Sequence, residues 1–214
     1  MTIRSFFAVP LKSGQVRRLA DHADTLCSFD SNFDNGNRIQ WTDSASYHLT
    51  LCFLGDISLE QVAALEHQTR QGFENQSLFT VQLSRSSYLQ VSPALAVLAA
   101  QADPQPELMQ LQQQVAALVA KVGIEVEEAD FRPHITLGRL SVMADRNAQS
   151  VAGATADSSD EPRWPNPDMR IQVDALVLYQ SKPDEHGSIY TPLFEIPLTA
   201  SATRHDEAAT ASFV

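Results

Sequence analysis

The sequence is short of cysteine, of basic residues and of long apolar runs, and each shortage narrows the kinds of protein that it encodes. Its two cysteines, Cys27 and Cys52, are too few for a disulfide framework and form no C-x-x-C pair, so we interpret them as free thiols in a reducing compartment. The 15 Lys and Arg against 26 Asp and Glu give a net charge of −11. This charge argues against a protein that coats nucleic acid, because non-specific binding requires many neutralised phosphates, but it is compatible with a pocket that binds one phosphate.

No apolar run approaches the length of a membrane span, and the apolar stretch in the opening MTIRSFFAVPLKSG is too short for a signal peptide. We therefore expect a cytoplasmic protein. With 214 residues, of which 43% are apolar, the chain is long enough for one full domain or for two small lobes that share a core.

Apolar periodicity predicts helices and strands mixed along the whole chain. Helical spacing and capping residues predict helices over residues 13–26, 58–73 and 103–123. Ser58 and Gln61 form a possible capping box at the start of the second helix. The buried stripe predicted for the third consists of Leu108, Leu111, Val115, Leu118 and Val122. Alternating and β-branched runs predict strands over residues 5–11, 38–41, 47–55, 78–89, 94–101, 124–128, 131–140, 169–181 and 190–198. This order predicts an α+β fold, and the duplicated motif described next predicts two similar lobes.

The same composition also suggests where the ordered domain ends. We expect a single domain of two lobes over residues 1–198. Residues 144–167 are rich in Ala, Ser, Asp and Pro, which predicts a mobile surface loop, and residues 199–214 are rich in Ala and Thr, which predicts a flexible tail.

One short pattern occurs twice and carries the functional argument. His-x-Thr-Leu is found as HLTL from His48 and as HITL from His134, each time inside a predicted strand. Side chains two residues apart on a strand point to the same face, so each copy presents an imidazole beside a hydroxyl while its apolar residues face the core. Across a cleft, two such pairs suit a phosphate: a neutral histidine deprotonates water, and a protonated histidine gives its proton to the leaving oxygen.

A third His-x-Thr, at His67, shows why context matters. It lies in a predicted helix, where side chains two residues apart point about 200° from each other and do not share a site. The tripeptide alone is weak evidence, but the longer pattern in two strands favours a functional pair over two buried structural histidines. We interpret His22, His67, His186 and His205 as solvated or incidental, because none has a partner in the sequence.

The two segments resemble those of a known family. HLTLCFLGD and FRPHITLGR look like the two signatures of the 2H phosphoesterases, specifically the bacterial and archaeal RNA 2',3'-cyclic phosphodiesterases once called 2'-5' RNA ligases. The resemblance extends from FFAVP near the N-terminus, through Trp41, to LVLYQSKPDEHGSIYTPL, and so covers the chain up to about Leu198. It implies two lobes with mainly antiparallel sheets and flanking helices, enclosing a central groove.

The resemblance also implies a reaction and assigns roles to four residues. The reaction opens a 2',3'-cyclic phosphate at an RNA end to leave a 2'-phosphate, without a metal or another cofactor. His48 is then the proton donor and His134 the proton acceptor. Thr50 and Thr136 hold the phosphate oxygens.

Two arginines near the second motif are candidate phosphate ligands. Arg139 matches a basic position of the family just after the motif, and a guanidinium there can grip a phosphate through two hydrogen bonds. Arg132, in FRPH, is a second candidate. The chain also departs from the family pattern: Gly138 stands where alanine is more usual, which we expect to matter little, and SPALAVLAAQ lacks the Arg, Lys and Trp common at that strand.

Other residues beside the motifs have two interpretations each. Strand alternation places Cys52 on the face of the first histidine and Phe53 on the buried face. For Cys52 we favour a packed side chain over a thiol nucleophile, because no sequence feature lowers its pKa. Tyr47, Trp41 and Phe131 are either rings that stack on a terminal base or ordinary core and rim residues.

The expected partners are RNA ends with a 2',3'-cyclic phosphate or small cyclic nucleotides, bound by a monomer with no membrane contact and no extended nucleic-acid surface. Two alternatives stay open: a ligase that joins RNA ends through a 2',5' linkage with the same residues, and a non-catalytic module that binds a nucleotide or phosphate. A metal site is disfavoured, because two histidines supply half of a tetrahedral ligand set. No G-x-x-x-x-G-K or G-x-G-x-x-G pattern supports a nucleotide cofactor.

Overall fold

The computed structural model describes residues 2–30, 39–92, 94–126, 130–141, 164–184 and 187–199, and shows the expected α+β fold. The helices in this part are α1 (Ser13–Asp30), η1 (Ser44–Ser46, a 3-10 turn), α2 (Leu59–Gly72) and α3 (Pro106–Lys121). The strands are β1 (Thr2–Pro10), β2 (Gln40–Trp41), β3 (His48–Ser58), β4 (Phe79–Ser92), β5 (Leu95–Ala102), β6 (His134–Ser141), β7 (Met169–Val173), β8 (Ala175–Asp184) and β9 (Gly187–Pro197).

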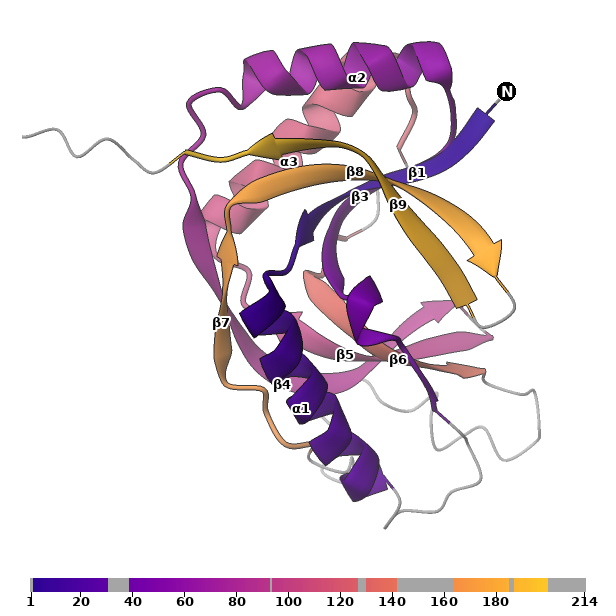
Figure 1. The fold of residues 1–214 in the computed structure, drawn as a ribbon, viewed down its shortest axis with the longest axis vertical. Helices are drawn as coiled ribbons and strands as arrows, with labels where there is room; N and C mark the ends of the chain where they lie inside the picture. Colours follow the sequence, from indigo (N-terminus) through magenta and orange to yellow (C-terminus); the bar gives the residue numbers. More distant parts are fainter. Residues whose placement is uncertain are drawn as a thin grey trace, which may run out of the picture.

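The described strands form one sheet whose two halves have the same pattern. Its order is β7-β4-β5-β6-β3-β1-β8-β9, with β2 paired to β6, and the pairings between these strands are antiparallel. β6 and β3 meet at the centre, so each half contributes one strand that carries a His-x-Thr-Leu motif. The two expected lobes are thus the halves of one curled sheet (Figure 1).

The helices bury their apolar stripes against this sheet. α2 and α3 pack against each other and against β3, while α1 lies at the other end of the molecule (Figure 1). Leu108, Leu111 and Val115 form the stripe predicted for α3, and they join a core that also receives Leu19 and Leu26 of α1. Burial of these stripes is what stabilises the helices, because helices of this length are marginal in water by themselves.

The helix ends follow their local chemistry. Gln61 N–H donates to Ser58 Oγ at 3.1 Å, and Ser58 N–H donates to Gln61 Oε1 at 2.9 Å, which is the capping box that the sequence predicts for α2. α3 begins at Pro106 rather than at Asp103, since the missing N–H of proline is harmless in the first turn. Asp103 instead accepts a hydrogen bond from Ser84, which ties the start of α3 to β4.

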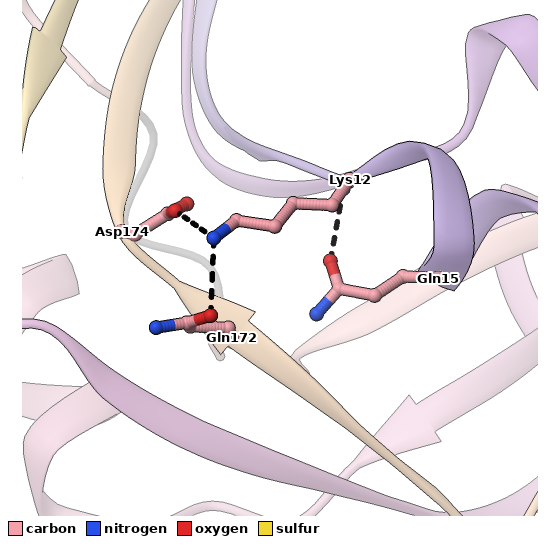
Figure 2. Close-up of polar contacts among 4 residues, drawn as sticks. All are labelled: Lys12, Gln15, Gln172 and Asp174. Atoms are coloured by element: carbon pink, nitrogen blue, oxygen red, sulfur yellow. Dashed lines mark hydrogen bonds and ion pairs between the residues drawn. The ribbon is translucent and has the colours of Figure 1, made fainter.

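The strand expected over residues 169–181 is broken at Asp174, where β7 of one lobe passes into β8 of the other. Lys12, at the start of α1, places its Nζ 2.6 Å from Asp174 Oδ2 and donates to Gln172 Oε1 at 3.1 Å (Figure 2). The backbone N–H of Lys12 donates to Gln15 Oε1 at 2.9 Å, so one residue links the first turn of α1 to this corner of the sheet.

The boundaries expected from composition fall partly outside the described residues. The loop expected over residues 144–167 lies outside them up to position 163, and Trp164, which follows, is buried. At the expected tail, the Thr199 N–H donates to the Gln76 carbonyl at 3.0 Å, and residues 200–214 lie outside the described part. Within the described chain, no helix combines the length and apolarity needed to cross a membrane.

Candidate active site

The two His-x-Thr-Leu segments lie side by side at the centre of the sheet. Leu49 of β3 pairs with Ile135 of β6 across the antiparallel ladder, and both are fully buried. The histidine and threonine that flank each of these residues therefore point to the opposite face, and the register sets each histidine opposite the threonine of the other motif. We call this surface the histidine face, the sheet face that carries His48, Thr50, His134 and Thr136.

The first motif ends in a β-bulge at Leu51. Thr50 and Cys52 pair with consecutive residues of β1, so Leu51 has no partner of its own. A bulge adds one residue to a strand, so each side chain after it points to the face opposite to the one that simple alternation predicts. Cys52 is accordingly buried in the core, and Phe53 is 68% exposed. Strand alternation predicts the reverse for both residues, and the bulge is the physical reason why that prediction is wrong.

The second motif has the same bulge, at Leu137. Thr136 and Gly138 pair with consecutive residues of β5, which turns Gly138 toward the core and Arg139 toward the histidine face. A Cβ added at Gly138 would collide with Cγ2 of Ile39 in the segment that leads into β2. In this chain, an alanine at position 138 would therefore require Ile39 to shift.

The backbone holds both imidazoles in the same tautomer. The Nδ1–H of His48 donates to the Ser46 carbonyl at 2.7 Å, and the Nδ1–H of His134 donates to the Arg132 carbonyl at 2.7 Å. Because a carbonyl only accepts, Nδ1 carries the proton of the neutral ring and Nε2 keeps its lone pair. Each Nε2 can then take up a proton when the ring is neutral and release one when the ring is charged.

Aromatic rings and positive charges surround His48. The ring centroid of Phe6 lies 4.9 Å from that of the imidazole. The centroid of the Tyr190 ring also lies 4.9 Å from it, and the planes of these two rings meet at 81° in a T-shaped contact. The pKa of His48 is lowered to about 4, first by burial and then by the nearby charges of His134 and Arg139. The backbone hydrogen bond acts in the opposite direction but is outweighed.

His134 shifts in the same direction. Its pKa is lowered below the ordinary value, chiefly by burial and further by the positive charge of Arg132. Both imidazoles are therefore neutral at pH 7 in the free protein. A negative phosphate between them would oppose the effect of the positive neighbours and favour a protonated ring.

The candidate phosphate ligands differ in where the structure places them. The hydroxyls of Thr50 and Thr136 make no hydrogen bond within the described residues, so both can donate to a ligand. Arg139 lies on the histidine face and donates to the Tyr190 hydroxyl at 3.3 Å. Arg132 is exposed and donates at 3.2 Å to a backbone carbonyl of β4, so it acts on the site through its charge on the second histidine.

A pocket opens beside the first histidine. Arg139 and Tyr190 line it together with Trp41. Of the three aromatic residues weighed from the sequence, Tyr47 is buried and Phe131 packs against the core, and only Trp41 reaches this pocket. Tyr190 contacts both the imidazole of His48 and the guanidinium of Arg139, although it is not among the site residues predicted from the sequence. Its signal was present, because it lies in the SIYTPL segment that carries the resemblance.

The other histidines lie away from this site. His22 is part-buried, with its Nε2 2.8 Å from Ser86 Oγ across the contact between α1 and β4. His67 is exposed on α2, as the helical pattern predicts, and His186 and His205 lie outside the described residues. No group of three His, Cys, Asp or Glu in the described chain could hold a metal ion.

Residues 39–185, which contain both motifs, match the 2'-5' RNA ligase superfamily. The chain belongs to this superfamily. Its resemblance to the RNA 2',3'-cyclic phosphodiesterases is confirmed by relatives of that name. The enzyme of Thermotoga maritima is 24% identical over 206 residues, which is 95% of this chain and 100% of the relative. That of Aeropyrum pernix is 24% identical over 173 residues, which is 80% of this chain and 93% of the relative.

The fold is similar to that of a solved structure. The crystal structure of E. coli LigT complexed with 3'-AMP matches 93% of this chain and 99% of LigT, with a TM-score of 0.64 and 24% identity. Membership of the superfamily and the names of the relatives support a phosphoesterase.

Proposed function

We propose that this member of the 2'-5' RNA ligase superfamily hydrolyses RNA 2',3'-cyclic phosphate ends to 2'-phosphate ends, with His48 as the acid and His134 as the base. The observation that supports it best is the pairing of two imidazoles on one sheet face, each with Nδ1 bonded to the backbone and Nε2 available. The relatives named RNA 2',3'-cyclic phosphodiesterase support this substrate class.

In the proposed reaction, Nε2 of His134 removes a proton from water as the water oxygen attacks phosphorus. The bond between phosphorus and the 3' oxygen breaks, and protonated His48 gives its Nε2 proton to that oxygen. The product carries a free 3'-hydroxyl and a 2'-phosphate. Thr50, Thr136 and Arg139 donate hydrogen bonds to the remaining phosphate oxygens, where negative charge accumulates.

The proton of the acid has to arrive with the substrate. His48 is neutral in the free protein at pH 7, since its pKa is about 4. The charges that lower the pKa of the imidazole, those of His134 and Arg139, are positive. The negative charge of the cyclic phosphate opposes them and raises this pKa. Binding at neutral pH is therefore expected to take up a proton, which calorimetry in buffers of different ionisation enthalpy measures.

The exposed ring of Phe53 suits the base of the terminal nucleotide. It lies on the histidine face, with its centroid 5.8 Å from that of Phe6, which in turn contacts His48. An exposed phenyl ring stacks on any base, because each base presents an aromatic face. We place the terminal base against Phe53, which leaves the arginine side of the site to the phosphate.

The test uses a short RNA that ends in a 2',3'-cyclic phosphate, incubated with the protein in EDTA. The expected product is heavier by one water and resists a phosphatase specific for 3'-phosphates. His48→Ala and His134→Ala should each lose ~10²–10⁴ of the rate, as expected for removal of a general acid or base. His67→Ala is the matched control and should retain full activity, because His67 is exposed on α2 and not on a strand of the histidine face.

Two alternatives predict other results in the same experiment. A ligase would join the cyclic end to an added RNA with a 5'-hydroxyl through a 2',5' linkage, although water is in large excess over that competitor. A binding module would hold the unreacted end with no turnover, and replacement of either histidine with glutamine would leave the binding intact. Each of these outcomes contradicts the proposed hydrolase.

A further inference from the structure

We propose that Tyr190 is a positioning residue that holds Arg139 on the histidine face and away from Asp43, and thereby sets the affinity of the site for phosphate. Tyr190 belongs to β9, whereas Arg139 belongs to β6 in the other half of the sheet. The inference rests on the proposed function in one respect, since it takes the ligand of the site to be a phosphate.

Tyr190 contacts both groups at once. Its ring makes a T-shaped contact with the imidazole of His48, with 4.9 Å between the ring centroids. Its hydroxyl oxygen accepts a hydrogen bond from Arg139 Nη2 at 3.3 Å. Within the described residues, the guanidinium of Arg139 makes no other hydrogen bond. The hydroxyl accepts here, so its own proton remains available to a phosphate oxygen.

The long side chain of Arg139 needs such a contact. Ordering an arginine costs much of its rotamer freedom, and a guanidinium that is ordered before binding loses less when the ligand arrives. A Cβ added at Gly187, at the start of β9, would be 4.0 Å from Arg139 Nη1. β9 therefore approaches the guanidinium at Gly187 as well as at Tyr190.

Asp43 is the group that competes for a freed guanidinium. It lines the same pocket as Arg139 and Tyr190, and its carboxylate is exposed. Its Oδ1 accepts the Ala45 N–H at 2.9 Å and so caps η1, while the second oxygen can accept from elsewhere. Without the tyrosine hydroxyl, charge attraction would draw Arg139 across the pocket toward Asp43 and away from the histidines.

Tyr179 provides a matched control. Its ring also lies near His48, with 6.1 Å between centroids, and it stacks on Phe6 at 5.5 Å. In the described structure its hydroxyl makes no hydrogen bond to Arg139. Replacing either tyrosine with phenylalanine removes one hydroxyl and keeps the ring, so the pair separates the contact with the arginine from a general loss of polarity near the imidazole.

The experiment measures the binding of inorganic phosphate by calorimetry and the titration midpoint of His48 by NMR in both variants. Tyr190→Phe should weaken phosphate binding about tenfold, the scale of one charge-assisted hydrogen bond, and should raise the midpoint of His48 because the positive charge has moved away. Tyr179→Phe should change neither quantity. Adding Asp43→Asn to Tyr190→Phe should restore most of the affinity, since asparagine still caps η1 but no longer attracts the arginine.

Three results would overturn the inference: wild-type phosphate affinity and an unchanged midpoint in Tyr190→Phe, equal losses in the two tyrosine variants, or a double variant no better than the single one. With the cyclic RNA end, Tyr190→Phe should raise KM by more than it lowers kcat. The binding and titration measurements need no turnover. If the wild-type protein had no activity, the proposed function would be refuted. The binding and titration measurements would still decide the role of Tyr190.

Discussion

Acidification from pH 7 to pH 5 is expected to destabilise the folded protein through His48. The imidazole has a pKa of about 4 in the folded protein, against ~6.5 in an unfolded chain. Between these two values the unfolded chain binds the proton and the folded protein does not, so the free energy of unfolding falls as the pH falls through 6.5 toward 4. At ~1.4 kcal/mol per pKa unit, the loss is about 2 kcal/mol at pH 5 and about 3 kcal/mol at pH 4.

Urea unfolding of the wild type and of His48→Gln at pH 7 and pH 5 tests this reasoning. Glutamine keeps a polar side chain of similar reach but has no proton to take up, so its contribution to stability does not depend on pH. The stability of the wild type relative to the variant should fall by about 2 kcal/mol between the two pH values. Parallel pH dependence of the two proteins would refute the buried, neutral imidazole on which the proposed proton uptake depends.

The pH profile of kcat/KM should be bell-shaped with its maximum below pH 6.5, because both histidines have lowered pKa values in the free protein. A flat profile from pH 5 to 8 would exclude acid and base catalysis by the two histidines. Gly138→Ala should cost ~1–3 kcal/mol in urea unfolding through its collision with Ile39, and unchanged stability would show that this segment yields freely. Phe53→Ala should raise KM for the cyclic RNA end without lowering the melting temperature, since the ring is exposed; an unchanged KM would place the base elsewhere. Cys52→Ala should lose stability, because the thiol is buried in the core, and should retain turnover, because burial raises the pKa of the thiol to about 11. A loss of turnover without a loss of stability would favour the hypothesis of a thiol nucleophile.

Much of the fold could be predicted because periodicity reports burial directly. The stripe of Leu108, Leu111 and Val115 and the capping box of Ser58 and Gln61 appear in the structure where the sequence places them. The break of the last long strand was not predicted. At the break, Asp174 forms an ion pair with a lysine 162 residues earlier in the chain. Such a long-range contact leaves no local signal.

The site itself depends on two features that alternation does not report. The bulges at Leu51 and Leu137 shift the side chains that follow by one face, which exposes Phe53 and brings Arg139 beside the histidines. Simple alternation would bury both of them. The resemblance to the family identified Arg139 without explaining its orientation. Phe53 lies beside the first motif, but alternation excludes it by assigning it to the buried face, because a bulge is set by pairing with a neighbouring strand.

The central claim is that two histidines act on opposite sides of one phosphorus, and a substrate with sulfur in place of the bridging 3' oxygen tests it most directly. A thiolate leaves without a proton, so this cyclic end needs a base but no acid. The account predicts that His48→Gln and His134→Gln both fail on the oxygen substrate and that only His48→Gln recovers on the sulfur substrate. Recovery of His134→Gln instead, or wild-type turnover of the oxygen substrate by either variant, would contradict it.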